Sequence, residues 1–266
     1  MKPNPVIMRQ LKRLEKQERR FLNRRESYLK MKTSPLVENI QDKVPDKLLV
    51  TLEKAFYKGF QLVFEKGHGY IERTYDRSKL QLNHELNNHQ WEQKGKRKYL
   101  RRIDKRVGRS RTLNSGISVL EGGILGILGI GLPDIPLLIS VMMRTIYETS
   151  ISYGFHYDTQ EERYYILLLI CGALTKGESQ REFNNKVDQV GIDLNYNLPI
   201  EFDIREQMGI TAGILSDAMV TAKFIQGIPI IGAVGSIANY GIIKKVGQYA
   251  GLKYKKRYLL KKYKSR

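Results

Sequence analysis

The sequence is poor in the residues that would support a disulfide framework or a metal site. Its 266 residues contain one cysteine, Cys171, and four histidines. A lone cysteine can form no internal disulfide. His84 and His89 are five positions apart, so they do not share a helix face as the four-residue zinc spacing would require. We therefore predict no metal, no cofactor, and an inert, buried thiol in a protein of a reducing compartment.

The sequence also lacks the motifs of the common enzyme classes. No glycine run is followed by the Lys-Ser/Thr pair of a phosphate loop, and no Gly-x-Ser-x-Gly elbow is present. Strand-like alternation bounded by turn signals is missing as well, which predicts an all-α multi-helix bundle. A non-enzymatic role is favoured. The enzymatic alternative is a hydrolase working at a membrane interface, with one cavity lined by Asp134, Arg144, His156 and Asn239.

No apolar stretch is long enough to read as a clean membrane span, which needs about 20 apolar residues. The nearest candidates are residues 116–133 and 227–243, both interrupted by glycine. Glycine inside a helix costs about 1 kcal/mol relative to alanine, so repeated glycine indicates close approach of two backbones. The small-residue spacing that permits this contact occurs at Gly122 with Gly126 and at Gly232 with Ser236.

Two interpretations of these glycine-rich stretches stay open. One is a tight hairpin buried in a helical core, and the other is partial insertion into a membrane. Glu121 argues against a deep span that faces lipid. The first residues carry no apolar segment of the kind found in secretory signals, so we expect no cleavable secretory signal.

Positive charge is abundant and concentrated at the two ends of the chain. The formal net charge is +19, and residues 244–266 hold ten Lys/Arg and no acid, whereas residues 112–243 hold 7 Lys/Arg against 14 acids. Such ends are either solvated faces or contacts for a polyanion. Tyrosines alternate with the C-terminal cations, which suits a lipid headgroup zone. The predicted membrane or anion contacts are Lys244, Lys245, Lys253, Lys255, Lys256, Arg257, Lys261 and Lys262.

Apolar periodicity predicts a series of helices. Residues 6–32 form a basic amphipathic helix rather than a coiled coil, because Glu18 and Arg25 interrupt its apolar seam. Residues 94–111 read as a basic linker or exposed helix. Further helices are expected at 46–66, 70–107, 134–154, 159–174, 178–190 and 204–226, with a Thr159–Glu162 capping box and glycine stops at Gly154 and Gly191.

Several segments, in this order, resemble the EcsC family. They are residues 44–67, the glycine-rich lead into residues 132–136, Arg144, residues 153–154 and 161–163, and residues 228–233 with Asn239. The resemblance covers residues 36–262, which divides the chain into a basic helical arm, 1–35, and an EcsC-like helical domain, 36–266. It implies an intracellular helical protein without an agreed activity, named for a protein encoded beside an ABC transporter and often linked to transport or secretion.

The resemblance supplies no catalytic residues. It implies that Asp134, Arg144 and Asn239 are recurring polar positions in apolar surroundings. Glu148 lies four residues after Arg144, which permits an ion pair on one helix face. We expect a buried network in which Asp134 or Glu148 pairs with Arg144. The functional alternative is a polar patch that binds a ligand.

These observations predict a cytoplasmic accessory protein that is peripheral to the inner face of the cell membrane. Its expected partners are anionic membrane lipids and a membrane transport protein. A nucleic-acid binder is the alternative that the same charge would allow, but no recognised reading motif for DNA or RNA is present.

Overall fold

The computed structural model describes residues 4–23, 46–116, 134–225 and 236–264. Throughout these ranges the regular structure is helical, with no strand, which confirms the predicted all-α class. Most of both glycine-rich stretches, including Gly122, Gly126 and Gly232, lies outside the described residues, and so does the side chain of Ser236.

The helices follow the predicted order. Their bounds are α1 Pro5–Leu22, α3 Asp46–Leu62, a π-helical turn Val63–Gly67, α4 His68–Glu72, α5 Arg77–Lys94, α6 Arg97–Gly116, α7 Asp134–Ser152, α8 Gln160–Leu174, α9 Gly177–Tyr196, α10 Ile204–Ile225 and α11 Ser236–Lys264. The single helix expected at 70–107 is wrong: that stretch is divided among three helices, with breaks at residues 73–76 and at Gly95, which has φ of 58°. The first helix ends at Leu22, short of the predicted end at residue 32.

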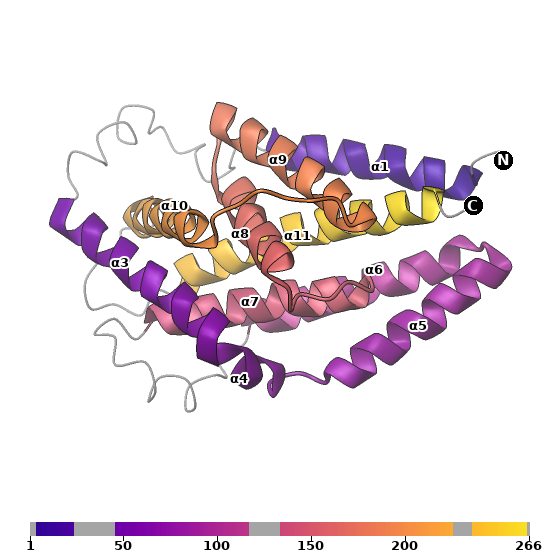
Figure 1. Ribbon diagram of the computed structural model, residues 1–266, viewed down its shortest axis with the longest axis horizontal. Helices are drawn as coiled ribbons and strands as arrows, with labels where there is room; N and C mark the ends of the chain where they lie inside the picture. The colour runs from indigo at the N-terminus through magenta and orange to yellow at the C-terminus, as the bar shows by residue number, and fades with distance from the viewer. Residues whose placement is uncertain (1–3, 24–45, 117–133, 226–235, 265–266) are drawn as a thin grey trace.

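The C-terminal helix α11 runs along the middle of the molecule (Figure 1). It packs against α1, α6, α7, α8, α9 and α10. Val246, Tyr249, Ala250 and Tyr254 are completely buried on it. The cationic C-terminal segment is therefore a central element of the bundle.

Helix α8 is largely buried and lies beside α9, α10 and α11. Every residue from Tyr164 to Leu174 is buried. A helix that is apolar on all sides belongs inside a protein or in a membrane. Among the described residues no helix combines the length and apolar character that crossing a bilayer requires.

Several helix ends lie where the sequence predicts them. Thr159 caps α8, because its side chain accepts a hydrogen bond of 3.2 Å from the backbone N–H of Glu162. Gly154 follows α7 with φ of +80°, a conformation that favours glycine.

The predicted stop at Gly191 is wrong, because α9 continues to Tyr196 and ends at Asn197 with φ of 52°. Gly191 instead permits a close approach between α9 and α11. A Cβ atom at this position would lie 3.1 Å from Cδ of Arg257. A glycine can thus mark a helix contact as well as a helix end.

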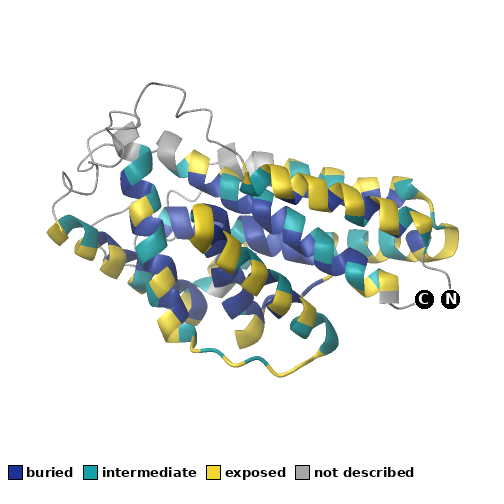
Figure 2. Cartoon of the chain, turned by 90° about the horizontal axis from the view of Figure 1, so that it is seen from above, coloured by how far each residue is buried: buried dark blue, intermediate teal, exposed yellow. Residues whose placement is uncertain are grey.

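The basic run 94–111 was expected to form either a linker or an exposed helix. Most of it lies in helix α6, which is only partly exposed. Tyr99, Leu100, Ile103 and Val107 are buried on the side that faces α5, α7 and α11. The cations lie on the other sides of the helix. Figure 2 shows this alternation of buried and exposed positions along the helices.

Replacing Gly154 with alanine should destabilise the fold. The positive φ is strained for alanine, and the added Cβ would lie 2.2 Å from Nε2 of His84. That imidazole is held by the carbonyl oxygen of Ser152 at 3.0 Å and by the edge of Tyr258. We expect a loss of about 1–3 kcal/mol in the free energy of unfolding, measured by urea denaturation.

Gly209→Ala is the matched control. Gly209 lies within α10, and a Cβ there would meet nothing within 4 Å. The helix should gain about 0.5–1 kcal/mol. Equal effects from the two substitutions would contradict this account of Gly154.

Candidate functional site

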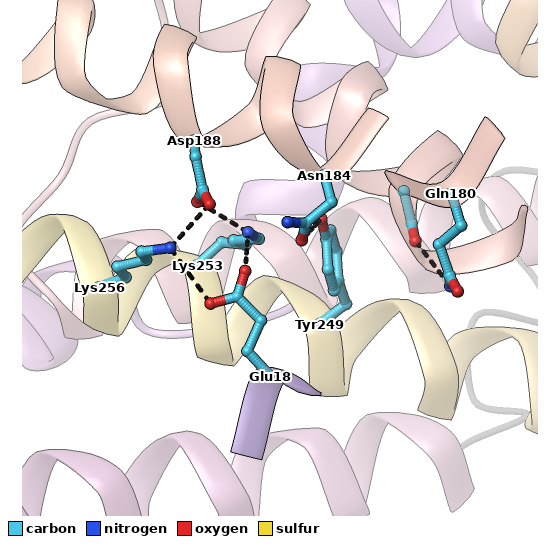
Figure 3. Close-up of polar contacts among 8 residues, drawn as sticks. Glu18, Gln180, Asn184, Asp188, Tyr249, Lys253 and Lys256 are labelled. Atoms are coloured by element: carbon cyan, nitrogen blue, oxygen red, sulfur yellow. Dashed lines mark hydrogen bonds and ion pairs between the residues drawn. The ribbon is translucent and has the colours of Figure 1, made fainter. Parts of the chain in front are cut away.

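Two lysines of α11 and two carboxylates from other helices form a mostly buried cluster, the Glu18 quartet (Figure 3). Lys253, which is 1% exposed, donates from Nζ to Glu18 of α1 and, at 2.7 Å, to Oδ1 of Asp188 on α9. Lys256 donates to Oδ2 of Asp188 at 2.7 Å and to Oε2 of Glu18 at 3.2 Å. Each charge of the quartet therefore faces two opposite charges.

Helix periodicity places these side chains together. Tyr249, Lys253 and Lys256 lie on one face of α11, because residues three and four apart are neighbours on a helix. Asn184 and Asp188 stand four apart on α9, and Asn184 accepts a hydrogen bond of 2.9 Å from Tyr249. A polar stripe of α9 thus meets a polar stripe of α11.

A second buried ion pair lies next to the quartet. Arg257 donates to both carboxylate oxygens of Glu162, at 3.0 and 2.7 Å. Its guanidinium also lies over the rings of Phe155 and Tyr165, at 4.3 and 4.6 Å from the ring centroids. Bidentate pairing combined with stacking is a strong arrangement for arginine.

The pKa shifts follow from burial and these partners. Burial lowers the pKa of Lys253 from its ordinary value, and Asp188 and Glu18 only partly oppose this. Burial also disfavours the charge of Lys256 and of Arg257. For these two groups the carboxylates outweigh burial, so the pKa is raised. The paired carboxylates thus offset much of the cost of placing cations in the interior.

A small recess with a cavity volume of only about 20 Å³ lies between α9 and α11 beside these pairs. Its lining includes Asp188, Lys253, Lys256 and Arg257. Ligand pockets usually measure about 300–1,000 Å³, and the three cations already face carboxylates inside the protein. The arrangement therefore supports a role in holding helices together rather than binding a small ligand.

A third polar cluster joins the α4–α5 connection to the segment between α7 and α8. Tyr157 donates to Glu72 at 2.6 Å, and its oxygen lies 2.5 Å from the hydroxyl of Tyr75. Arg77 pairs with Glu72 and Asp158 and lies over the Tyr157 ring. Burial is the main cause that raises the pKa of both phenols, so they are neutral at physiological pH and unsuited to act as bases.

The predicted Arg144–Glu148 pair is present, with 2.8 Å between Nε and Oε1. Asn239 lies near the start of α11, and its buried Oδ1 has no hydrogen-bond partner among the described residues. The side chain of Asp134 lies outside the described part of the chain, and His156 is exposed. The structure thus joins Arg144 to Glu148, and among the described residues no hydrogen bond or ion pair links either side chain to Asn239 or His156.

Most of the predicted C-terminal lipid contacts face other helices. Lys253, Lys256 and Arg257 belong to the clusters above, Lys255 pairs with Asp104 of α6 at 2.7 Å, and Lys262 pairs with Glu92 of α5. Lys244 and Lys261 are exposed, and Lys245 is half-buried. Sequence reasoning missed these carboxylates because they come from distant helices. One signal existed, since Glu18 interrupts an otherwise apolar seam.

These features define a class: an all-α protein whose central helix is held to its neighbours by internal ion pairs. The model of the EcsC protein family matches residues 8–259. The chain therefore belongs to the EcsC family. The match includes residues 8–22 of α1, which lie outside the range of the sequence resemblance, and it contains all four residues of the quartet.

Two Bacillus subtilis (strain 168) proteins are similar to the chain. It is 26% identical to Protein EcsC over 136 residues, covering 51% of this chain and 52% of that protein. It is 23% identical to the uncharacterized protein YdbA over 161 residues, covering 59% of this chain and 57% of YdbA. The chain thus matches little more than half the length of either relative. No solved structure matches it.

Replacing Glu162 with glutamine should strongly destabilise the protein, because Arg257 would keep its charge in a buried position without a carboxylate. Breaking a buried pair in this way costs about 3–5 kcal/mol. Glu161→Gln removes the same charge from the same helical turn at an exposed position and should have little effect. Urea unfolding of both variants measures the difference, and similar losses would refute a special role for the pair.

Stability should fall as the pH rises above about 10, the ordinary pKa of tyrosine. Burial raises the pKa of Tyr75, Tyr147, Tyr157, Tyr165, Tyr249, Tyr254 and Tyr258. The unfolded chain therefore releases these protons at lower pH than the folded protein, which favours unfolding. The lowered pKa of Lys253 acts oppositely, but seven tyrosines outweigh it.

The measurement compares tyrosinate absorbance with helical circular dichroism as the pH rises. We expect the buried phenols to ionise together with loss of helix. Full tyrosine titration near pH 10 in a protein that keeps its helical signal would contradict the expectation.

Proposed function

We propose that this EcsC-family protein is a non-enzymatic accessory protein that attaches to anionic lipid at the inner face of the cell membrane. The observation that carries the proposal is a set of exposed cations on α1 and α6, called the basic face below. Its members are Arg9, Lys12, Arg13, Lys16, Arg19 and Arg20 on α1, and Lys98, Arg101, Arg102, Lys105 and Arg109 on α6.

Acidic side chains offset little of the positive charge of the basic face. Glu15 is the exposed acid of α1. The acid of α6, Asp104, is partly buried and is occupied by Lys255 and by the hydroxyl of Tyr153. The basic face therefore keeps a large local excess of positive charge, which attracts an anionic surface by about 1 kcal/mol for each nearby Lys or Arg.

The two helices contribute to one electrostatic field. Asn4, which caps α1, lies near Gly95 at the turn between α5 and α6. Desolvation lowers the pKa of Arg97 on α6, and the charges of Arg101 and of Arg13 from α1 lower it further. The proximity of these like charges supports a single docking surface formed by α1 and α6.

Exposed apolar groups at the same end favour lipid over a purely ionic partner. Met8 of α1 is 40% exposed and Tyr263 of α11 is 39% exposed. The start of α1 and the end of α11 lie at this end of the bundle (Figure 1). Long cationic side chains and amphipathic rings suit the headgroup region of a bilayer. A membrane transport protein as a second partner rests on the family resemblance alone.

Neutralising three cations of α6 tests the proposal. The triple variant Lys98→Gln, Arg101→Gln, Lys105→Gln should bind phosphatidylglycerol vesicles about a hundredfold more weakly, since three contributions of about 1 kcal/mol each are lost. Flotation at low ionic strength measures binding. The wild type should release at high salt and should not bind vesicles of neutral lipid.

The matched control removes three exposed lysines from α3, by Lys47→Gln, Lys54→Gln and Lys58→Gln. This helix lies at the other end of the molecule (Figure 1), so its variant should bind nearly as well as the wild type. Equal weakening by the two triple variants would disprove the basic face. Failure of the wild type to bind anionic vesicles, with a gel shift of nucleic acid at physiological salt, would replace lipid by the polyanion alternative.

A further inference from the structure

Helix α1 has the side-chain distribution of a helix that can lie in a membrane interface. Ile7 and Leu14 are each 1% exposed and face the bundle, with Leu11, Phe21 and Leu22 partly buried beside them. Six cations occupy the remaining sides. An apolar stripe bordered by Lys and Arg is the pattern of helices that bind in the plane of a membrane surface.

The attachment of α1 to the bundle is narrow. The helix lies at the edge of the molecule (Figure 1), and among the described helices it packs chiefly against α11. Phe21 stacks on Tyr249, with 5.2 Å between ring centroids, and Glu18 completes the quartet on α9 and α11. In the sequence, the next described helix after α1 is α3, which begins at Asp46.

Glu18 favours the position of α1 on the bundle, called the docked position below, over a position on a bilayer. On a bilayer this residue would lie within the apolar stripe, where a carboxylate is unfavourable. On the bundle it lies between Lys253 and Lys256. The quartet therefore favours the docked position, whereas the apolar stripe and the cations would be equally suited to an anionic bilayer.

If α1 left the bundle, it would lose apolar packing and the ion pairs of Glu18, and anionic lipid can compensate for both. The acyl region can accept Ile7, Leu14 and Phe21, which now face the bundle. When Glu18 leaves, Lys253 and Lys256 share only Asp188 within the quartet, so this site changes from neutral to a net charge of +1. A lipid phosphate can then occupy the place of the Glu18 carboxylate.

We propose that α1 is a membrane-binding helix that leaves α11 on an anionic bilayer and inserts its apolar stripe into the interface, with the Glu18 quartet opposing its release. This inference rests on the proposed function and adds the element that enters the lipid. It requires Phe21 to exchange the ring of Tyr249 for acyl chains.

The single tryptophan of the chain allows a direct test. Trp91 lies on α5 and is 1% exposed, so it reports whether the body of the protein enters the membrane. Phe21→Trp places a second reporter on the stripe of α1. With phosphatidylglycerol vesicles that carry brominated acyl chains, we expect loss of fluorescence in the Phe21→Trp variant and little loss in the wild type. Leu22→Trp provides a second position if the first variant does not fold.

The role of the quartet is tested by adding Glu18→Gln to the reporter variant. This change weakens the docked position, so quenching should begin at lower lipid concentration and become larger. Glu15→Gln is the matched control, because it removes the same charge from an exposed position one turn earlier. Its quenching should follow that of the reporter variant apart from a small electrostatic gain.

The outcomes separate the two proposals. Vesicle binding without quenching at position 21 or 22 would overturn the release of α1 and leave the proposed function intact. Quenching of Trp91 in the wild type to the same extent would also overturn it, since the whole body would then insert. Equal behaviour of Glu18→Gln and Glu15→Gln would refute the quartet as the opposing contact. If no variant and no wild-type protein bound the vesicles, the proposed function itself would fail.

Discussion

The structure depends on the pairing of cations that α11 carries into the interior. A buried charge without a partner costs several kcal/mol, so each internal cation of α11 requires a carboxylate at a defined position. Lys253 and Lys256 take theirs from α1 and α9, Lys255 from α6 and Arg257 from α8. Lys262 pairs with the exposed Glu92 of α5 at the surface. The pairs therefore determine which helices pack against α11 and how they are aligned along it. Apolar packing alone tolerates many similar arrangements.

The same pairing divides the positive charge of the protein into two populations. Cations on α11 are largely neutralised within the fold, and their stems fill space beside buried tyrosines. The cations of α1 and α6 have few acidic neighbours and remain at the surface. The uncompensated part of the net charge of +19 therefore lies mainly at the surface. This positive surface is the basis of the proposed attachment to anionic lipid.

Helix α1 connects these two populations. Its outer sides belong to the basic face and its inner side supplies Glu18 to the quartet. Attraction to an anionic surface and internal ion pairing thus act on one helix. On the proposal above, this arrangement links a change in the surroundings of α1 to a change in the packing of the bundle.

Local signals predicted much of the fold. Thr159 caps a helix and Gly154 follows one, because both roles depend on backbone geometry within a few residues. The buried character of α8 could also be predicted from its composition. Gly191 was misinterpreted, since its close contact with Arg257 comes from a helix distant in sequence.

The candidate site was far less predictable. Arg144 and Glu148 are four residues apart, so their pair could be inferred from the helix period. Glu18 and Lys253 are separated by 235 residues, and no local pattern connects them. The helical class, the strong positive charge and the family membership could be inferred from the sequence, because periodicity, charge and residue order are properties of the chain. Which cations are internal depends on the folded arrangement, because a charge is neutralised by what lies near it in space.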